Sequence, residues 1–224
     1  MKKLAATVIV LLLIVVLSKA HAQLYEHPFN LRQLKMGQAS VAAGAGLANK
    51  RVMAVGNLEF GVLPGIEIFL KAGQIYFDDA RSPTLSPMSF FYSGISSIQP
   101  LIRSDWNCLV SASFFGSTVD ERKGIENSTQ GFSVGLGFYH RLIGETALTV
   151  APYGLMHYDR SWWTLGEETS RGGAFSGQIG IEVDLSPNMS VLGNVIYPFK
   201  ADHSTLFGIF FSFHPSITRS TIIP

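Results

Sequence analysis

The stretch from Gly131 to Tyr158 alternates strictly between two kinds of residue, and this period of two most constrains the fold. One set of alternate positions is mainly apolar: Phe132, Val134, Leu136, Phe138, His140 and Leu142. The intervening set is small or polar: Ser133, Gly135, Gly137, Tyr139 and Arg141. After a break at Ile143-Gly144-Glu145 the alternation resumes. Such a pattern predicts strands with two different faces. Each run has about ten residues or more, which exceeds a typical soluble strand and matches a tilted strand that crosses a bilayer.

The composition agrees with a chain built from glycine-rich and aromatic-rich strands. Of 224 residues, 47% are hydrophobic and 15% are charged, with 22 Gly and 16 Phe. The formal net charge of +1 supplies no basic field, so no nucleic-acid partner is expected. Cys108 is the single cysteine and cannot form an internal disulfide. An exported chain of this kind must be held together by backbone ladders and packing.

The N-terminus predicts export. Residues 1–22 have a basic start, an apolar core from Leu4 to Leu17, and a small-x-small site at Ala20-His21-Ala22, which is typical of a cleaved signal peptide. An uncleaved anchor helix is the alternative. Beyond it we expect a polar periplasmic leader at 23–35, a barrel at 36–214 and a C-terminal tail at 215–224.

The rest of the chain repeats the same hairpin pattern. It predicts an all-β, antiparallel transmembrane barrel of ten strands, with eight as the alternative count and a soluble β-sandwich as the alternative architecture. Tight turns, such as the one at Pro64-Gly65, alternate with longer loops at 78–87, 119–130 and 159–172. Short turns on one side and longer loops on the other are typical of bacterial barrels whose ends lie in the periplasm.

Aromatic residues cluster near the ends of the expected strands, on the apolar face. Two interfacial belts are predicted. The outer belt comprises Tyr76, Phe132, Tyr158, Phe175, Tyr197 and Phe207. The inner belt comprises Phe60, Trp106, Phe138 and Phe213.

With these features, nearly all of the chain beyond residue 22 resembles small bacterial outer-membrane β-barrel proteins. The resemblance implies residence in a Gram-negative outer membrane. It also implies contact with lipid and lipopolysaccharide, and insertion by the barrel-insertion machinery. In that family the last strand commonly ends in an aromatic residue. Phe211 and Phe213 fit this pattern, although eleven residues follow Phe213.

The expected inward faces carry few charges, namely Glu59, Glu67, Lys71, Arg141, Glu182 and, less clearly, Asp184. We interpret them as a network that fills a narrow lumen, in which Lys71 pairs with Glu59 and acids balance Arg141. The corresponding function is a structural or surface-interaction barrel. A narrow, porin-like passive channel is the alternative, in which the same charges select solutes.

An enzyme is the least favoured alternative. Asp78-Asp79, Asp202-His203, His157 and Asp159 are expected at the outer rim, and the arrangement resembles the acidic and His residues of omptin-type surface proteases. We expect solvated loop charges instead, and no cofactor or metal site. The loops at 119–130 and 159–172 could contact an extracellular ligand. The pair Trp162-Trp163 would then either recognise that ligand or anchor the loop at the membrane surface.

Overall fold

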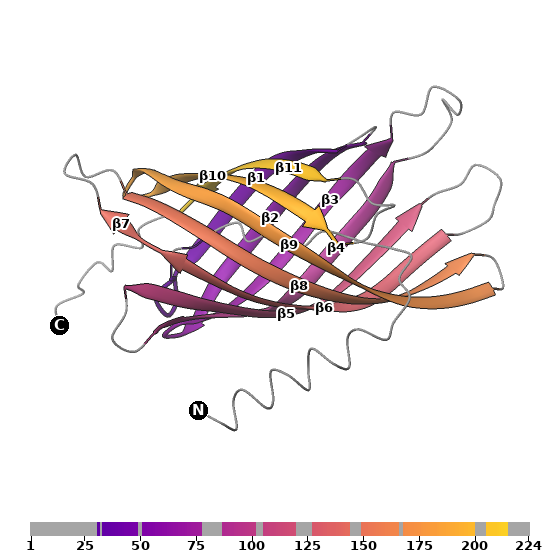
Figure 1. Ribbon diagram of the computed structural model, residues 1–224, viewed down its shortest axis with the longest axis horizontal. Coiled ribbons are helices and arrows are strands. Elements are labelled where there is room, and N and C mark those ends of the chain that lie inside the picture. Colours follow the sequence, from indigo (N-terminus) through magenta and orange to yellow (C-terminus); the bar gives the residue numbers. More distant parts are fainter. Residues whose placement is uncertain are drawn as a thin grey trace, which may run out of the picture.

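The strands form one closed antiparallel barrel (Figure 1). This computed structural model describes residues 31, 33–48, 51–77, 87–101, 105–119, 127–143, 149–165, 168–199 and 205–214. The strand segments are β1 (Ala39–Ala48), β2 (Arg51–Leu63), β3 (Ile66–Phe77), β4 (Met88–Pro100), β5 (Trp106–Val119), β6 (Asn127–His140), β7 (Leu142–Ile143), β8 (Thr149–Leu165), β9 (Glu168–Ser186), β10 (Met189–Pro198) and β11 (Leu206–Phe213).

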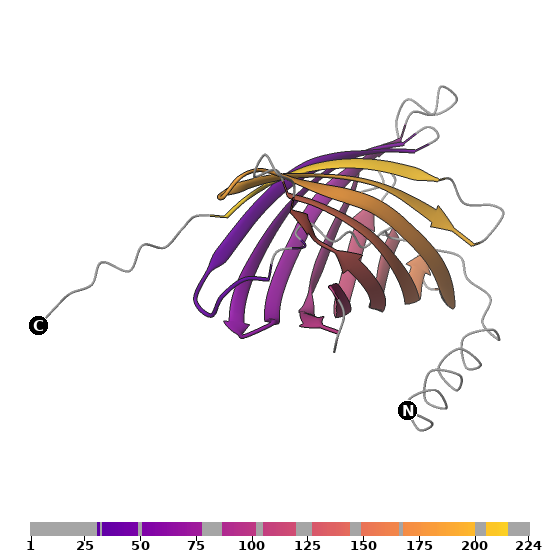
Figure 2. The ribbon, with the colours of Figure 1, turned by 60° about the vertical axis from the view of Figure 1, so that its left-hand side comes forward.

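Each strand pairs with its neighbours in the chain, and two further pairings close the circle. The order is β6-β5-β4-β3-β2-β1-β11-β10-β9-β8-β7, and β6 also pairs with β8. β6 and β7 follow one another in the chain, and both pair with the same edge of β8. They therefore share one position in the wall, and the eleven segments occupy ten positions. The predicted ten-strand antiparallel barrel is therefore confirmed, and Figure 2 shows its curved wall from a second direction.

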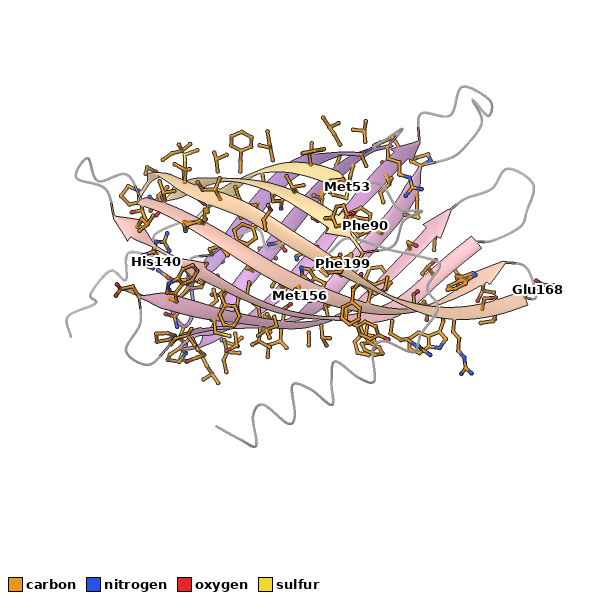
Figure 3. All side chains as sticks on the ribbon, in the orientation of Figure 1. Met53, Phe90, His140, Met156, Glu168 and Phe199 are labelled. Carbon is orange, nitrogen blue, oxygen red and sulfur yellow. The ribbon has the colours of Figure 1, made fainter. Side chains whose placement is uncertain are left out.

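The two faces of each strand differ as the alternation predicts. In β2, Leu58 and Phe60 are exposed on the outside, whereas Asn57 and Glu59 are buried in the lumen. The same division holds in β6, where Leu136 is 44% exposed and Ser133 is fully buried. Figure 3 shows apolar side chains projecting from the outer wall. The barrel thus presents an apolar exterior and a packed, partly polar interior.

Two expected loops are shorter than predicted, because the strands beside them are longer. β8 runs to Leu165 and β9 begins at Glu168, so most of the predicted loop at 159–172 is a paired hairpin. Similarly, β5 ends at Val119 and β6 begins at Asn127, so only residues 120–126 separate them. Polar and charged residues are frequent in both places. A ladder that extends beyond a membrane keeps its hydrogen bonds without needing an apolar outer face.

Several predicted segments lie outside the described residues: the signal peptide at 1–22, most of the leader at 23–35, the tail at 215–224, and Asp78, Asp79, Asp202 and His203. Within the described part of the chain, no helix has the length and apolar character to cross a membrane.

The seam between β1 and β11 depends on a glycine. A Cβ atom added to Gly44 would lie within 2.5 Å of the Ile209 carbonyl oxygen and even nearer to the ring of Phe210, which is fully buried. On β10, which pairs with the other edge of β11, Gly193 has no atom within 4 Å of its added Cβ.

We therefore predict that Gly44→Ala weakens the barrel and Gly193→Ala does not. The substitution at Gly44 should cost about 1–3 kcal/mol, since the ring of Phe210 and the backbone must move to admit the methyl group. Reversible urea unfolding in detergent or lipid, followed by tryptophan fluorescence, measures both variants. Equal stability of the two variants would contradict this account of the seam.

Candidate functional site in the lumen

The strongest candidate site is one mouth of the lumen, where the chain before β1 enters the barrel. We call this mouth the turn end, because it carries the tight turns Pro64-Gly65 and Pro187-Asn188; the opposite mouth is the loop end. Leu31 is fully buried and Leu34 is 3% exposed. We call residues 31–35, of which all but residue 32 are described, the strap. Two residues of the expected leader at 23–35 therefore lie buried in the barrel mouth, and its periplasmic location stays a prediction.

Two lumen carboxylates hold the strap through its backbone. The amide of Leu34 donates to Glu67 Oε1 at 2.6 Å, and the amide of Leu31 donates to Glu182 Oε2 at 3.0 Å. Glu67 lies on β3 and Glu182 on β9, five wall positions apart in either direction around the ring of ten. The two acids thus stand on opposite walls. Three extended residues reach about 10 Å, so the strap crosses the mouth between them.

The strap then turns into β1 through close backbone contacts with β2. Gln38 donates its backbone N–H to the Lys35 carbonyl at 2.9 Å, and Gly37 donates to the Gly61 carbonyl at 2.8 Å. Gly37 has a φ of 80°, which favours glycine. A Cβ on Gly61 would meet the Lys35 carbonyl, so the strap can pack on β2 only where that side chain is missing.

Glu182 is shared between the strap and the wall. Its Oε1 accepts a hydrogen bond of 2.6 Å from Ser190 Oγ, while its Oε2 accepts from the strap. Ser190 Oγ also lies 3.4 Å from His214 Nε2, just after β11. A buried carboxyl group needs hydrogen bonds of this kind to offset its lost hydration.

Arg141 is balanced by an acid, as predicted. Its Nη2 lies 2.6 Å from Asp184 Oδ2, and the pair is partly buried where β6 gives way to β7. Asp184, placed inward only with reservation from the sequence pattern, is therefore a lumen residue.

Lys71 and Glu59 both lie in the lumen but are not directly opposite one another. The register between β2 and β3 places Asn57 opposite Lys71 and Phe69 opposite Glu59. Asn57 Nδ2 donates to Glu59 Oε1 at 2.9 Å, and Lys71 Nζ lies 4.6 Å from the centre of the Phe69 ring. Glu59 is thus a diagonal neighbour of Lys71, and their pairing stays a prediction.

Further along the lumen, polar groups and rings fill the interior. Gln178 donates from Nε2 to the Tyr153 hydroxyl at 2.7 Å, and its Oε1 lies 3.3 Å from His157 Nε2. A Cβ on Gly135 would lie 2.9 Å from His157 Nδ1, so this glycine makes room for the imidazole. The rings of Tyr92 and Phe115 pack with centroids 5.3 Å apart, and both are at most 2% exposed.

Two residues of the expected rim cluster, His157 and Asp159, are described in the structure, and neither lies at the rim. His157 and Asp159 are each 2% exposed, because β8 continues past them to Leu165. They line the lumen instead of the rim. Among the described residues, no group of three or more His, Cys, Asp or Glu side chains is placed to hold a metal ion.

The predicted belt residues all lie on the outer wall. Seven are well exposed: Phe60, Tyr76, Trp106, Phe138, Tyr197, Phe207 and Phe213. The other three are half-buried against neighbours on the same face, as in the Tyr158–Phe175 pair, whose ring centroids are 5.0 Å apart, and in Phe132, whose ring is 6.1 Å from that of Trp162.

The strap is the functional element that the sequence pattern missed. One signal was present: the inward acids Glu59, Glu67, Glu182 and Asp184 outnumber the inward bases Lys71 and Arg141. Buried carboxylates beyond the number of bases require other donors. The backbone amides of a neighbouring segment supply them, and the apolar residues Leu31 and Leu34 lie in that segment.

Comparisons with known proteins place the chain by its fold alone. No family model matches the sequence, and no curated protein does. Among solved structures, the chain is similar to the β-domain of the Bordetella autotransporter BrkA (13% identity, 81% of this chain and 100% of that chain, TM-score 0.49). It is also similar to Ail, the attachment invasion locus protein of Yersinia pestis (13%, 80% and 98%, 0.38). The N-terminal barrel domain of Pseudomonas aeruginosa OprF matches at 9% identity, over 81% of this chain and 100% of that chain, with a TM-score of 0.38. The chain resembles bacterial outer-membrane β-barrels, with no subfamily identified.

We predict that Glu67→Ala releases the strap, since Leu34 then loses its acceptor at the wall. The test uses a Cys108→Ala background and a single thiol introduced by Leu34→Cys. Maleimide should label this thiol slowly when Glu67 is present and at least about fivefold faster in Glu67→Ala, because leaving the buried amide of residue 34 without its acceptor costs about 1–3 kcal/mol. Met36→Cys, at a residue that is 69% exposed, is the control and should react rapidly in both backgrounds. Unchanged labelling at position 34 would show that Glu67 does not hold the strap.

Proposed function

We propose that this protein is an integral outer-membrane β-barrel whose lumen is closed and whose role is structural or in surface interaction. The observation that carries the proposal is the strap, which crosses the turn end between Glu67 and Glu182 and buries Leu31 completely. A passive pore needs a continuous aqueous path, and this arrangement places apolar side chains and paired carboxylates across that path.

Packing above the strap supports the same function. Large side chains from opposite walls meet in the lumen, among them Tyr92 at 1% exposure and Phe210 and Leu192 at 0%. Polar lumen groups such as Gln178 are engaged with one another. Ten strands enclose a narrow interior, and side chains of this size fill it.

The outer wall supports membrane residence. Leucine, isoleucine and phenylalanine side chains remain about half exposed on consecutive strands, including Leu58, Leu70, Ile95, Ile209 and Phe211. Contact of a continuous apolar band with lipid is favourable, whereas its exposure to water costs free energy. The start of β1 and the end of β11 both lie at the turn end. Export through the inner membrane would therefore place the turn end in the periplasm.

Single-channel recording in planar bilayers tests the closed lumen. The wild type should show no large, steady conductance. The double variant Glu67→Ala/Glu182→Ala should show frequent openings, since both anchors of the strap are removed. Glu168→Ala changes an exposed acid at the loop end and should behave as the wild type does. A large steady conductance in the wild type would reject the closed lumen and favour the narrow channel.

The membrane-facing surface is tested by an arginine placed at two depths. Leu136 lies on the outer face between Phe132 and Phe138, so Leu136→Arg should cost about 2–4 kcal/mol in unfolding from lipid. Ser89 is exposed near the loop end of β4, so Ser89→Arg should cost about 0–1 kcal/mol. Similar costs at both positions would contradict membrane insertion with this outer face. Recovery of the protein as a soluble periplasmic monomer on cell fractionation would do the same.

A further inference from the structure

The outer face of the described strands carries acidic or basic side chains at one place. Alternation places every Asp, Glu and Lys of these strands on the inner face, and Arg51 with them. The exceptions are Arg160 on β8 and Arg171 on β9, which share the outer face with Tyr158 and Phe175. They lie near each other, since Arg171 is opposite Trp162, two residues beyond Arg160. No acidic partner of either guanidinium is seen in the described part of the chain.

The strand register aligns these arginines with a groove near the loop end. One row of directly opposed residues runs across five strands: Phe91, Gly116, Gln130, Trp162 and Arg171. The row nearer the middle of the barrel contains Phe114, Phe132 and Arg160, and the row nearer the loop end contains Thr118, Ser128, Thr164 and Thr169. Rings and cations thus share two adjacent rows on one face, and hydroxyls occupy the next row toward the loop end.

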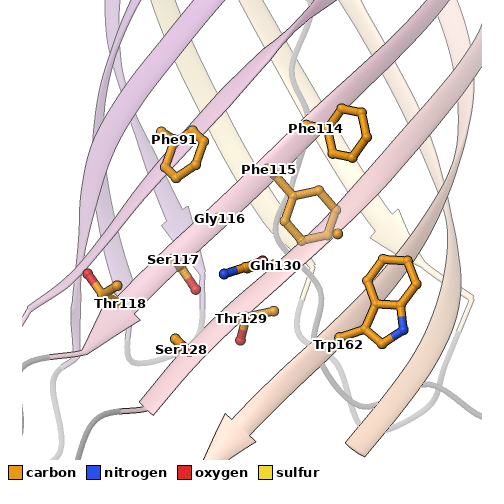
Figure 4. A pocket seen from close by; sticks show the side chains of 11 residues that line it. Phe91, Phe114, Phe115, Gly116, Ser117, Thr118, Ser128, Thr129, Gln130 and Trp162 are labelled. Atoms are coloured by element: carbon orange, nitrogen blue, oxygen red, sulfur yellow. The ribbon is translucent and has the colours of Figure 1, made fainter. Parts of the chain in front are cut away.

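The groove itself is a half-open hollow of about 250 Å³ between the rings of Phe91, Phe114 and Trp162 (Figure 4). Its outward-facing floor contains Gly116 and Gln130. Any side chain at Gly116 would collide with Phe91, because an added Cβ would lie 2.5 Å from that ring. The missing side chain at Gly116 leaves the groove open at this point. Phe114, which is 71% exposed, lies beside the groove.

We propose that this groove, together with Arg160 and Arg171, binds a phosphate-bearing lipid of the outer leaflet. The planar guanidinium groups suit bidentate contact with phosphate oxygens, and a cation on a lipid-facing wall gains from such an anion. The rings of Phe114 and Phe132 offer apolar contacts for acyl chains, and Trp162 suits the interface between chain and headgroup. The row of hydroxyls beyond them suits hydroxyl groups of a sugar headgroup.

A lipid is the chosen occupant because the cations and the rings face outward together. A soluble phosphate would use the arginines but leave the exposed rings of Phe91 and Phe114 in water. A lipid satisfies both, since its anionic headgroup can contact the arginines while its chains contact the neighbouring rings of the same two rows. The inference rests on the proposed outer-membrane location, which the fractionation experiment tests separately.

Purified protein in detergent, stripped of lipid, is titrated with bis-phosphorylated lipid A, and the bound fraction is measured by native mass spectrometry. Arg160→Gln/Arg171→Gln should raise the Kd about 30-fold, since each arginine near a charged lipid surface contributes about 1 kcal/mol. Trp162→Ala should also weaken binding. The matched control is Arg51→Gln, which changes an arginine at the same end of the barrel on the other face.

Two further arms distinguish the occupant. Dephosphorylated lipid A should bind the wild type as weakly as lipid A binds the double arginine variant, and millimolar inorganic phosphate should not displace lipid A. Equal Kd values for the wild type and the double variant, with circular dichroism showing both folded, would overturn the proposal. Displacement by inorganic phosphate would also overturn it, because the site would then be an anion site without a lipid requirement.

Discussion

Closure of the sheet between β1 and β11 is the constraint on which the rest of this structure depends. It gives every strand position two hydrogen-bonded neighbours and removes the free edges that would otherwise pair with other chains. It also creates an interior that has no exit through the wall. The small residues of β1 make closure possible at close range, because Phe210 occupies the space that a side chain at Gly44 would need. Every other feature, from the packed rings to the strap, follows from the need to fill or seal that interior.

The buried acids and the strap depend on each other. Glu67 and Glu182 are costly to bury unless donors reach them, and the amides of Leu34 and Leu31 are costly to bury unless acceptors reach them. The strap amides therefore offset the free-energy cost of burying the two acids, and the acids offset the cost of burying the amides. The interaction uses backbone amides, so the identity of the side chains in the strap matters mainly for filling space, which Leu31 and Leu34 do at 0% and 3% exposure. A seal of this kind tolerates changes of sequence that preserve size and apolar character.

The sequence predicted the barrel and its facing because both depend on a local period of two. Leu136 and Ser133 could be assigned to opposite faces from their spacing alone, and the structure agrees. The length of the β8–β9 hairpin was not predicted, because the charged and polar residues within 159–172 favour a loop in a local reading of the sequence. The strap was missed for a different reason. Its partners are 33 and 151 residues away in the chain, and no local pattern encodes such a distance.

That separation orders the assembly of the molecule. Leu31 precedes all the strands, yet its amide reaches a carboxylate on β9, which is synthesised late in the chain. The strap therefore cannot take its place until almost the whole wall has been made and brought into a circle. A nascent or partly inserted barrel has an unsealed interior with two carboxylates that still require water. Contacts between distant parts of a chain form slowly, so we expect the strap, although it precedes every strand, to be among the last segments to become ordered.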